Sequence, residues 1–450
     1  MSIFHVQQSC LGALCAAALF FLAAPAQALD LLESYQAALS EDADYQAARA
    51  TANAGREALP LARSQLLPNL SANAARTRND LETETSNLAG QTNTLNSKYP
   101  STNYSLTLRQ ALYRPAQYAG YLQAFAQVAG SEASFDKAGQ DLAVRVAGAY
   151  FNVLLAEETL RQVESQQVAI VGQLAAAKRA LEAGQGTRTD IDDAQAKLDL
   201  NRAKLLSARQ QIDQTRHELQ ILVNRPVDNL RPLDKQRLEL HSLHPTALTD
   251  WIERAALASP ELREMKARVE VARHETARAW AGHKPTLDLI VQRSISENDN
   301  VTNPNSRFDN SQIGVQLAVP LFAGGYVSAQ LRQAQAALVE TEQRHESVRR
   351  KLATQVRKEY QGVQEGILKV QALTLAEYST DQSVISNEKG FRAGIRSRID
   401  ILNAGETRGS VRLELARERV LYAMSRVRLL ALSGELNEAA IAGMNRWLAE

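Results

Sequence analysis

The sequence predicts a mainly α-helical protein made of two copies of one structural unit, each with a small β part. Gly184 and Gly394 lie 210 residues apart, and this offset aligns the segment 183–190 with the segment 393–400. Two long stretches without proline, 116–182 and 325–392, keep apolar residues at helical spacing. Four short runs alternate with a period of two residues instead, which is typical of β-strands.

The repeat extends well beyond the two aligned turns. Tyr150 matches Tyr360, and the run 105–113 matches the run 314–322. Self-similarity of this kind indicates a repeat architecture, which determines where in the fold each motif lies. We therefore predict a first structural repeat at 29–235, a connector at 236–245, a second repeat at 246–437 and a C-terminal tail at 438–450.

Composition limits the partners of the chain. The 450 residues carry a formal net charge of +1, which gives no electrostatic reason to expect a nucleic acid. Aromatic residues make up 5% of the chain while alanine is abundant, a composition that suits long helices packed through small side chains.

The first 28 residues resemble a secretory signal peptide. An apolar run at 11–24 precedes Ala26-Gln27-Ala28, a cleavage-site pattern, although no Lys or Arg comes before the run. A short buried helix is the alternative. Both cysteines, Cys10 and Cys15, fall in this segment, so we expect a mature chain without cysteine or lipid anchor. No later apolar run has the roughly 18 residues of a transmembrane helix.

Each repeat is predicted to begin with an amphipathic helix, at 31–66 and at 246–282, and Pro60 should bend or restart the first. Strands follow at 70–75 and 103–111 in the first copy, and at 287–292 and 312–321 in the second. The polar segments 79–100 and 297–310 are expected to be exposed loops between them.

The strand lengths leave two interpretations open. Strands of about ten residues cross a bilayer when they are tilted and closed into a barrel. A soluble antiparallel sheet with one buried face fits the same pattern. Four strands cannot close a barrel alone, so the first interpretation needs several copies of the chain.

Long helical hairpins follow the strands. A helix over 115–182 would be about 100 Å long, more than one globular domain needs. A returning helix carries apolar residues every seven positions, the pattern of a coiled-coil seam: Ile191, Leu198, Leu205, Ile212 and Leu219. The second copy repeats this with helices at 325–392 and 400–432. Long rods combined with hairpins of bilayer length suggest a membrane barrel continued by a helical tube.

The sequence resembles the TolC family of outer-membrane factors, the exit ducts of type I secretion systems and multidrug efflux pumps. The resemblance covers the whole mature chain and is carried, besides the two turns, by the motifs AYFNVL at 149–154, HKPTLDL at 283–289 and VPLFAGG at 319–325. It implies a homotrimer in the cell outer membrane, in which each subunit gives four strands to one barrel of about twelve. It also implies a helical barrel that crosses the periplasm and opens when a periplasmic adaptor and an inner-membrane transporter bind.

The resemblance also assigns roles to residues at the helical turns. Asp400 and Asn403 match a ring of acidic gate residues, with Asn in place of the second acid. Arg396 matches a linking arginine, for which Asp190 and Thr189 are the expected partners, and Phe391 replaces a linking tyrosine. Gly184 and Gly394 mark the turns that adaptors contact. Without the family, Asp400 would be a helix cap, Arg396 a solvated turn residue, and the glycines helix ends.

Nothing in the sequence indicates an enzyme. No catalytic motif, phosphate loop or metal-ligand cluster is found, and no cofactor is expected. The leading hypothesis is a passive export duct, with type I protein secretion slightly favoured over drug efflux. The alternative is a soluble periplasmic coiled-coil scaffold or adaptor without channel activity.

Overall fold

The structure is a computed structural model that describes residues 28–86, 90, 92–234, 237–238, 240, 243–298 and 306–449. The predicted signal peptide therefore lies outside the described residues except for Ala28. The chain forms two compact units. We call the one with residues 47–139 and 252–355 the sheet unit, and the one with residues up to 46, 140–251 and from 356 on the hairpin unit.

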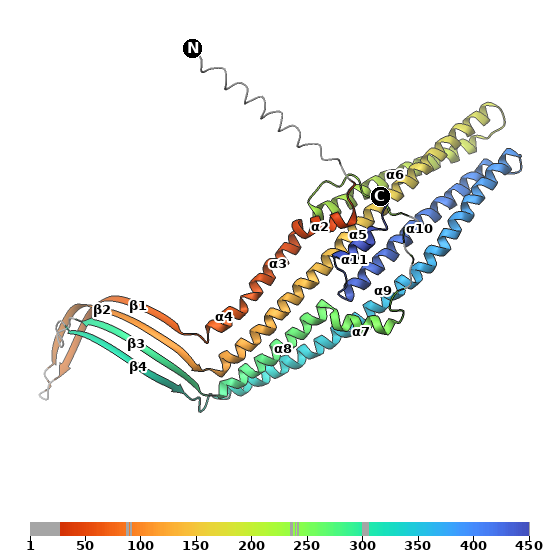
Figure 1. Cartoon of the computed structure of the whole chain (residues 1–450). Coiled ribbons are helices and arrows are strands. Elements are labelled where there is room, and N and C mark those ends of the chain that lie inside the picture. Colours follow the sequence, from red (N-terminus) through yellow and green to blue (C-terminus); the bar gives the residue numbers. More distant parts are fainter. Residues whose placement is uncertain are drawn as a thin grey trace, which may run out of the picture. The chain divides into compact units, whose positions relative to one another are not determined.

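The sheet unit contains one antiparallel sheet of four strands in the order β1-β2-β3-β4 (Figure 1). The first repeat supplies β1 (Asn69–Ser86) and β2 (Thr92–Tyr113), and the second supplies β3 (Thr286–Asn298) and β4 (Ser306–Ala318). The two predicted hairpins are confirmed. The two outer strands, β1 and β4, have no partner on their far edges among the described residues.

The predicted loops are wrong in extent. Pairing between β1 and β2 continues to Ser86 and Thr92, through most of the segment expected as a loop. Apart from Leu81, Leu95 and Tyr99 these residues are polar on both sides, so they lack the alternation that reveals a half-buried strand. At the other end, β4 stops at Ala318, before Pro320, whose ring nitrogen cannot donate to a ladder.

Several helices flank the sheet in sequence: α3 (Ala43–Arg56), α4 (Ala58–Ser64), α7 (Leu248–Ala258), α8 (Pro260–Trp280) and the 3-10 helix η1 (Ala281–His283). The predicted restart of the helix at Pro60 is confirmed to within two residues, because α4 begins at Ala58. The chain breaks at Asp42 and Glu57, and Pro60 is the third residue of α4, where a backbone N–H would have no helical partner.

Two helical hairpins dominate the hairpin unit (Figure 1). In the first, α5 (Pro115–Glu182) is followed by α6 (Arg188–Val223); in the second, α9 (Tyr326–Arg392) is followed by α10 (Arg398–Leu432). The first parts of α5 and α9 belong to the sheet unit. The predicted seam of α6 is confirmed, because Leu198, Leu205, Ile212 and Leu219 are all buried and Ile191 is partly buried. Burial of one such side chain contributes about 1.5–3 kcal/mol.

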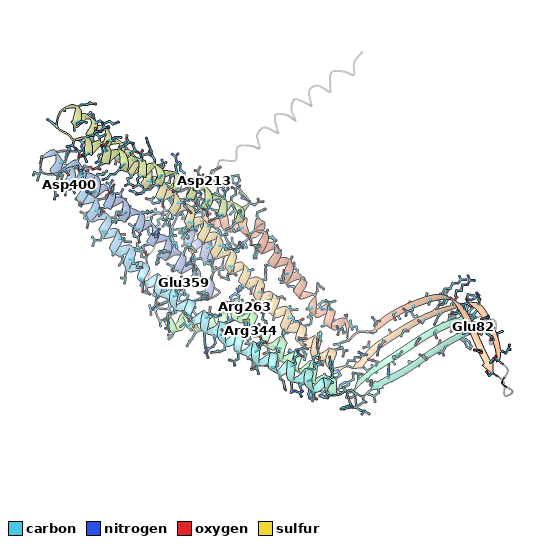
Figure 2. All side chains as sticks on the ribbon, turned by 180° about the vertical axis from the view of Figure 1, so that it is seen from behind. Glu82, Asp213, Arg263, Arg344, Glu359 and Asp400 are labelled. Carbon is cyan, nitrogen blue, oxygen red and sulfur yellow. The ribbon has the colours of Figure 1, made fainter. Side chains whose placement is uncertain are left out.

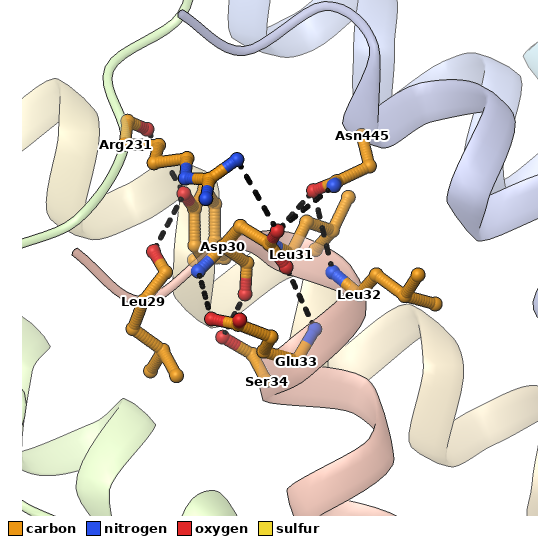
Figure 3. Close-up of polar contacts among 9 residues, drawn as sticks. Leu29, Asp30, Leu31, Leu32, Glu33, Ser34, Arg231 and Asn445 are labelled. Carbon is orange, nitrogen blue, oxygen red and sulfur yellow. Dashed lines mark hydrogen bonds and ion pairs between the residues drawn. The ribbon is translucent and has the colours of Figure 1, made fainter. Parts of the chain in front are cut away.

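The chain ends of the hairpin unit are joined by polar contacts (Figure 3). Asp30 caps α2 (Leu31–Glu41) in a capping box with Glu33. The Asn445 amide, at the end of α11 (Glu438–Asn445), accepts a hydrogen bond from the Leu31 N–H at 3.1 Å and donates one to the Asp30 carboxylate at 3.0 Å. The predicted tail thus contains a helix that is held against the start of the first repeat.

Matched tyrosines show the repeat in three dimensions. The buried Tyr150 hydroxyl lies 2.9 Å from the Arg231 carbonyl oxygen and 3.2 Å from that of Leu29, where the first repeat begins. Tyr360 donates to the carbonyl of Thr246, where the second repeat begins. Burial raises the pKa of Tyr150 above its ordinary value, so the hydroxyl keeps its proton as a donor. Each tyrosine therefore fastens the start of its own repeat to its long helix.

Candidate functional site

The tips of the two helical hairpins share one backbone geometry. Gly184 has φ of +71° and Gly394 has φ of +74°, a left-handed conformation that favours glycine. After each glycine the chain folds back, and the N–H of Gln185 donates to the Ala180 carbonyl as the N–H of Ile395 donates to Gly390, both at 2.9 Å. This is the Schellman pattern of helix ends. The glycines are explained first by the turn itself.

The helix after each turn begins with a capping box. Thr187 caps α6 and Ser397 caps α10. Asp190 and Asp400 are the third residues of their helices, so the sequence-based expectation that these aspartates are the caps is wrong. The Asp400 carboxylate accepts hydrogen bonds from the Ser397 N–H at 2.8 Å and from its hydroxyl at 2.9 Å. Asp190 does the same with Thr187, at 3.0 and 2.7 Å.

These hydrogen bonds also stabilise the ionised form of the two carboxylates. The backbone N–H and then the hydroxyl of Ser397 lower the pKa of Asp400, and the Thr187 hydroxyl and N–H lower that of Asp190. On the single chain Asp190 is exposed and Asp400 is partly exposed, and both carboxylates are ionised at neutral pH. Each tip therefore presents a fixed negative charge at the start of its second helix, where the helix dipole favours it.

Asp400 lies at the tip of the α9–α10 hairpin (Figure 2). The Arg398 guanidinium lies over the Phe391 ring, 5.0 Å from its centre. Asn403 is exposed in the second turn of α10. The backbone N–H of Arg396 donates to Gly390 at 3.2 Å. No bond from Arg396 to Asp190 or Thr189 occurs among the described residues of this single chain, and the gate links stay a prediction.

A small apolar cluster joins the two hairpins. It contains Ile170 and Leu174 of α5, Ala194 and Leu198 of α6, and Leu402 of α10. Leu402 is the only member from the second hairpin. A cavity of about 590 Å³ lies beside it, between α5, α9 and α10. Near their tips the two hairpins thus meet through a small apolar contact.

Ion pairs hold the second hairpin together further from its tip. Arg412 of α10 bonds Asp381 at 2.9 Å and Glu377 at 3.2 Å, both on α9. Arg419 is buried two helical turns after Arg412. Burial lowers the pKa of Arg419, and the negative charges of Glu377 and Glu158 oppose that shift. Sequence reasoning missed this network. Its signal was present, since the acids lie four residues apart on one helix and the arginines seven apart on the other.

The sheet has one apolar and one polar face. Directly paired residues of antiparallel strands share a face, and Leu70, Leu108, Val291 and Ile313 form one row across all four strands. Apolar rows extend from Leu287 to Ile295 along β3, about 26 Å at the rise of a strand. Ile313 is 75% exposed. The other face carries pairs such as Gln292 and Gln312, joined by a hydrogen bond of 2.9 Å.

Only one charged pair interrupts the apolar rows among the described residues. Arg293 and Asp309 lie in neighbouring rows of β3 and β4 and bond at 3.0 Å. A guanidinium and a carboxylate that neutralise one another cost less on an apolar face than either would alone.

A buried carboxylate fixes the start of the sheet. The Asp288 side chain on β3 is 5% exposed and accepts hydrogen bonds from Arg109 of β2, at 2.7 Å, and from Arg114, which precedes α5. A buried carboxylate is tolerated because both arginines neutralise it. The cluster ties the end of β2 to β3 where the chain leaves the sheet for the long helix.

The described residues hold neither a membrane-spanning helix nor a metal-binding cluster. No helix in this part of the chain combines the length and the apolar character needed to cross a membrane. Histidine, cysteine and acidic side chains do not gather there in groups that could hold a metal ion.

Comparison with known proteins relates the chain to others over most of its length. The family model described as outer membrane efflux protein matches residues 34–225 and 251–435. The alkaline protease secretion protein AprF of Pseudomonas aeruginosa is 32% identical, over 94% of this chain and 88% of its own. The outer membrane protein TolC of Escherichia coli is 26% identical, over 94% and 86%. Among solved structures, the Neisseria gonorrhoeae MtrE outer membrane channel is similar with a TM-score of 0.73 and 22% identity, over 91% of this chain and 90% of that one.

Proposed function

Because the chain belongs to the outer membrane efflux protein family, we propose that it is the exit duct of a three-part export system. It is a protein of the outer membrane with a periplasmic helical part, and its expected relation to the TolC family is confirmed. Substrate would pass from an inner-membrane transporter and a periplasmic adaptor through the duct to the outside. The duct itself changes nothing chemically, in keeping with a family of channels.

The observation that carries the proposal is the two-faced sheet. Its apolar rows measure about 26 Å along a strand, which is about 20 Å of height at the roughly 40° tilt of barrel strands, and this covers most of the roughly 25 Å apolar band of outer-membrane barrels. The apolar face fits lipid and the polar face fits an aqueous bore. A soluble scaffold would instead leave Ile313, Val315 and Leu317, each more than 60% exposed, in water.

The open edges of the sheet support a homotrimer. Unpaired strand edges cannot remain in lipid, because no water is present to satisfy their N–H and C=O groups. Pairing β1 of one copy with β4 of the next removes both edges. Three copies would give a barrel of about twelve strands, as the family resemblance implies.

The hairpin tips are the proposed gate. Three copies of Asp400 around a common axis would repel one another and favour cations, and Asn403 would leave the ring weaker than one with two acids. Arg396 would bond Asp190 or Thr189, while Phe391 cannot supply the hydrogen bond of a tyrosine. The turns at Gly184 and Gly394 would face the adaptor. The limited contact at Leu402 is consistent with hairpins that separate on opening.

We favour type I protein secretion over drug efflux, because AprF is named for the secretion of a protease. The test is to delete the gene in its host and compare the proteins of the culture medium. Loss of one or a few exported proteins is expected. An unchanged set of exported proteins together with increased drug sensitivity would favour efflux.

The membrane part of the proposal has a separate test. The protein should remain with outer membranes after a high-salt wash, and purified trimers should give stepwise currents in planar bilayers. Release into the wash without any current would contradict the duct and favour the scaffold.

A further inference from the structure

A groove of about 450 Å³ lies in the sheet unit where β2 passes into α5 and α8 passes into η1. Its walls are apolar and aromatic, with Leu112 and Tyr113 from β2, Tyr118 and Leu122 from α5, and Trp280 from α8. Lys284, directly after η1, adds a positive charge. A hollow of this size can hold part of a small amphipathic ligand.

The groove is continuous with the apolar face of the sheet. Tyr113 pairs with Leu287, which pairs in turn with Leu317, so the three form the first apolar row. Tyr113 is also part of the groove wall. Whatever covers the apolar face therefore also reaches the groove. The inference that follows rests on the proposed function, in which this face contacts lipid.

The polar end of the groove carries one available cation. Arg114 also lines it, but Asp288 occupies its guanidinium. The Lys284 ammonium lies 4.1 Å from the centre of the Trp280 ring, and no ion pair engages it within the described part of the chain. Trp and Tyr with a neighbouring lysine are the side chains that settle at the level of lipid headgroups.

We propose that this groove binds one phospholipid of the periplasmic leaflet. The phosphate contacts the Lys284 ammonium beside Trp280, and an acyl chain runs along Leu112 and Tyr113 toward the apolar rows. The bound lipid fills the junction at which the strands become helices. The ammonium of Lys284 recognises the phosphate, and the apolar wall selects a ligand that carries an acyl chain.

The test is native mass spectrometry of the trimer, stripped of lipid in mild detergent and titrated with dioleoyl phosphatidylglycerol. Wild type should retain this lipid, and Lys284→Gln should weaken its binding about fivefold, since one lysine contributes about 1 kcal/mol at an anionic lipid surface. Trp280→Ala should weaken it as well. Lys266→Gln is the matched control, because Lys266 lies exposed on α8 outside the groove, and it should bind like wild type.

Equal retention by Lys284→Gln and wild type would overturn the proposal, as would an equal loss in Lys266→Gln. Binding of lipopolysaccharide in preference to phosphatidylglycerol would also contradict it, because that lipid belongs to the other leaflet. The failure of the duct would look different. It would appear as absent currents in wild type, whatever lipid the protein retains.

Discussion

Replacing Leu402 by alanine should loosen the contact between the two helical hairpins. Leu402 is 8% exposed and is the second hairpin's only side chain in the shared apolar cluster. Leucine-to-alanine changes in cores cost about 2–5 kcal/mol. Because a cavity of about 590 Å³ already adjoins the site, water can enter, and we expect the lower part of this range.

A loss of about 2–3 kcal/mol corresponds to a roughly 30- to 150-fold increase in the population of separated hairpins. In the proposed duct, molecules with separated hairpins would conduct ions without the adaptor. Trimers with Leu402→Ala should therefore open more often in planar bilayers, and amide exchange near the start of α10 should become faster.

Leu198→Ala is the matched control, because Leu198 is 5% exposed in the same cluster but belongs to the first hairpin. It should destabilise α5 against α6 while leaving exchange in α10 closer to wild type. If Leu402→Ala changes neither the open fraction nor the exchange of α10, the cluster does not hold the hairpins together and the reasoning fails.

Four further predictions concern single groups. Ser397→Ala removes the cap of α10 and should cost about 1 kcal/mol, seen as faster amide exchange confined to the first turn; uniform protection would contradict it. The pKa values of Asp190 and Asp400 lie below their ordinary value of 3.8, so the capping contribution is complete at neutral pH and is lost as pH falls through the folded pKa; the protection factors of the tip amides, which correct for the pH dependence of intrinsic exchange, should be constant from pH 7 to 5 and fall only below about pH 4. Arg396→Ala should raise the leak conductance of trimers, and an unchanged leak would remove Arg396 from the gate. Asp288→Asn leaves two arginines without their carboxylate and should cost about 3 kcal/mol, measured as a lower temperature of trimer dissociation on gels.

Some elements could be predicted from the sequence because local signals mark their ends. Pro115 begins α5 and an Ala-Gly pair follows both long helices, so their bounds agree with the structure within one residue. The seam of α6 was equally readable, since a seven-residue spacing needs only one partner helix to be buried.

Other features depend on contacts that no local pattern specifies. The polar extension of β1 and β2 has no buried face, so hydrophobic alternation cannot show it. Leu402 looks like any apolar residue of α10, and only the fold places it against α5 and α6. The gate links of Arg396 depend on how copies assemble, which neither the sequence nor a single chain determines.

The central claim is that three copies share one barrel through the edges β1 and β4. Both native cysteines lie in the predicted signal peptide, so cysteines introduced in pairs, one along β1 from Asn69 to Asn79 and one along β4 from Ser306 to Ala318, would be unique in the mature protein. Mild oxidation in outer membranes should join some of these pairs between chains and give a ladder that ends at the trimer on denaturing gels. Monomers at every pair, or a ladder that continues past the trimer, would contradict the account.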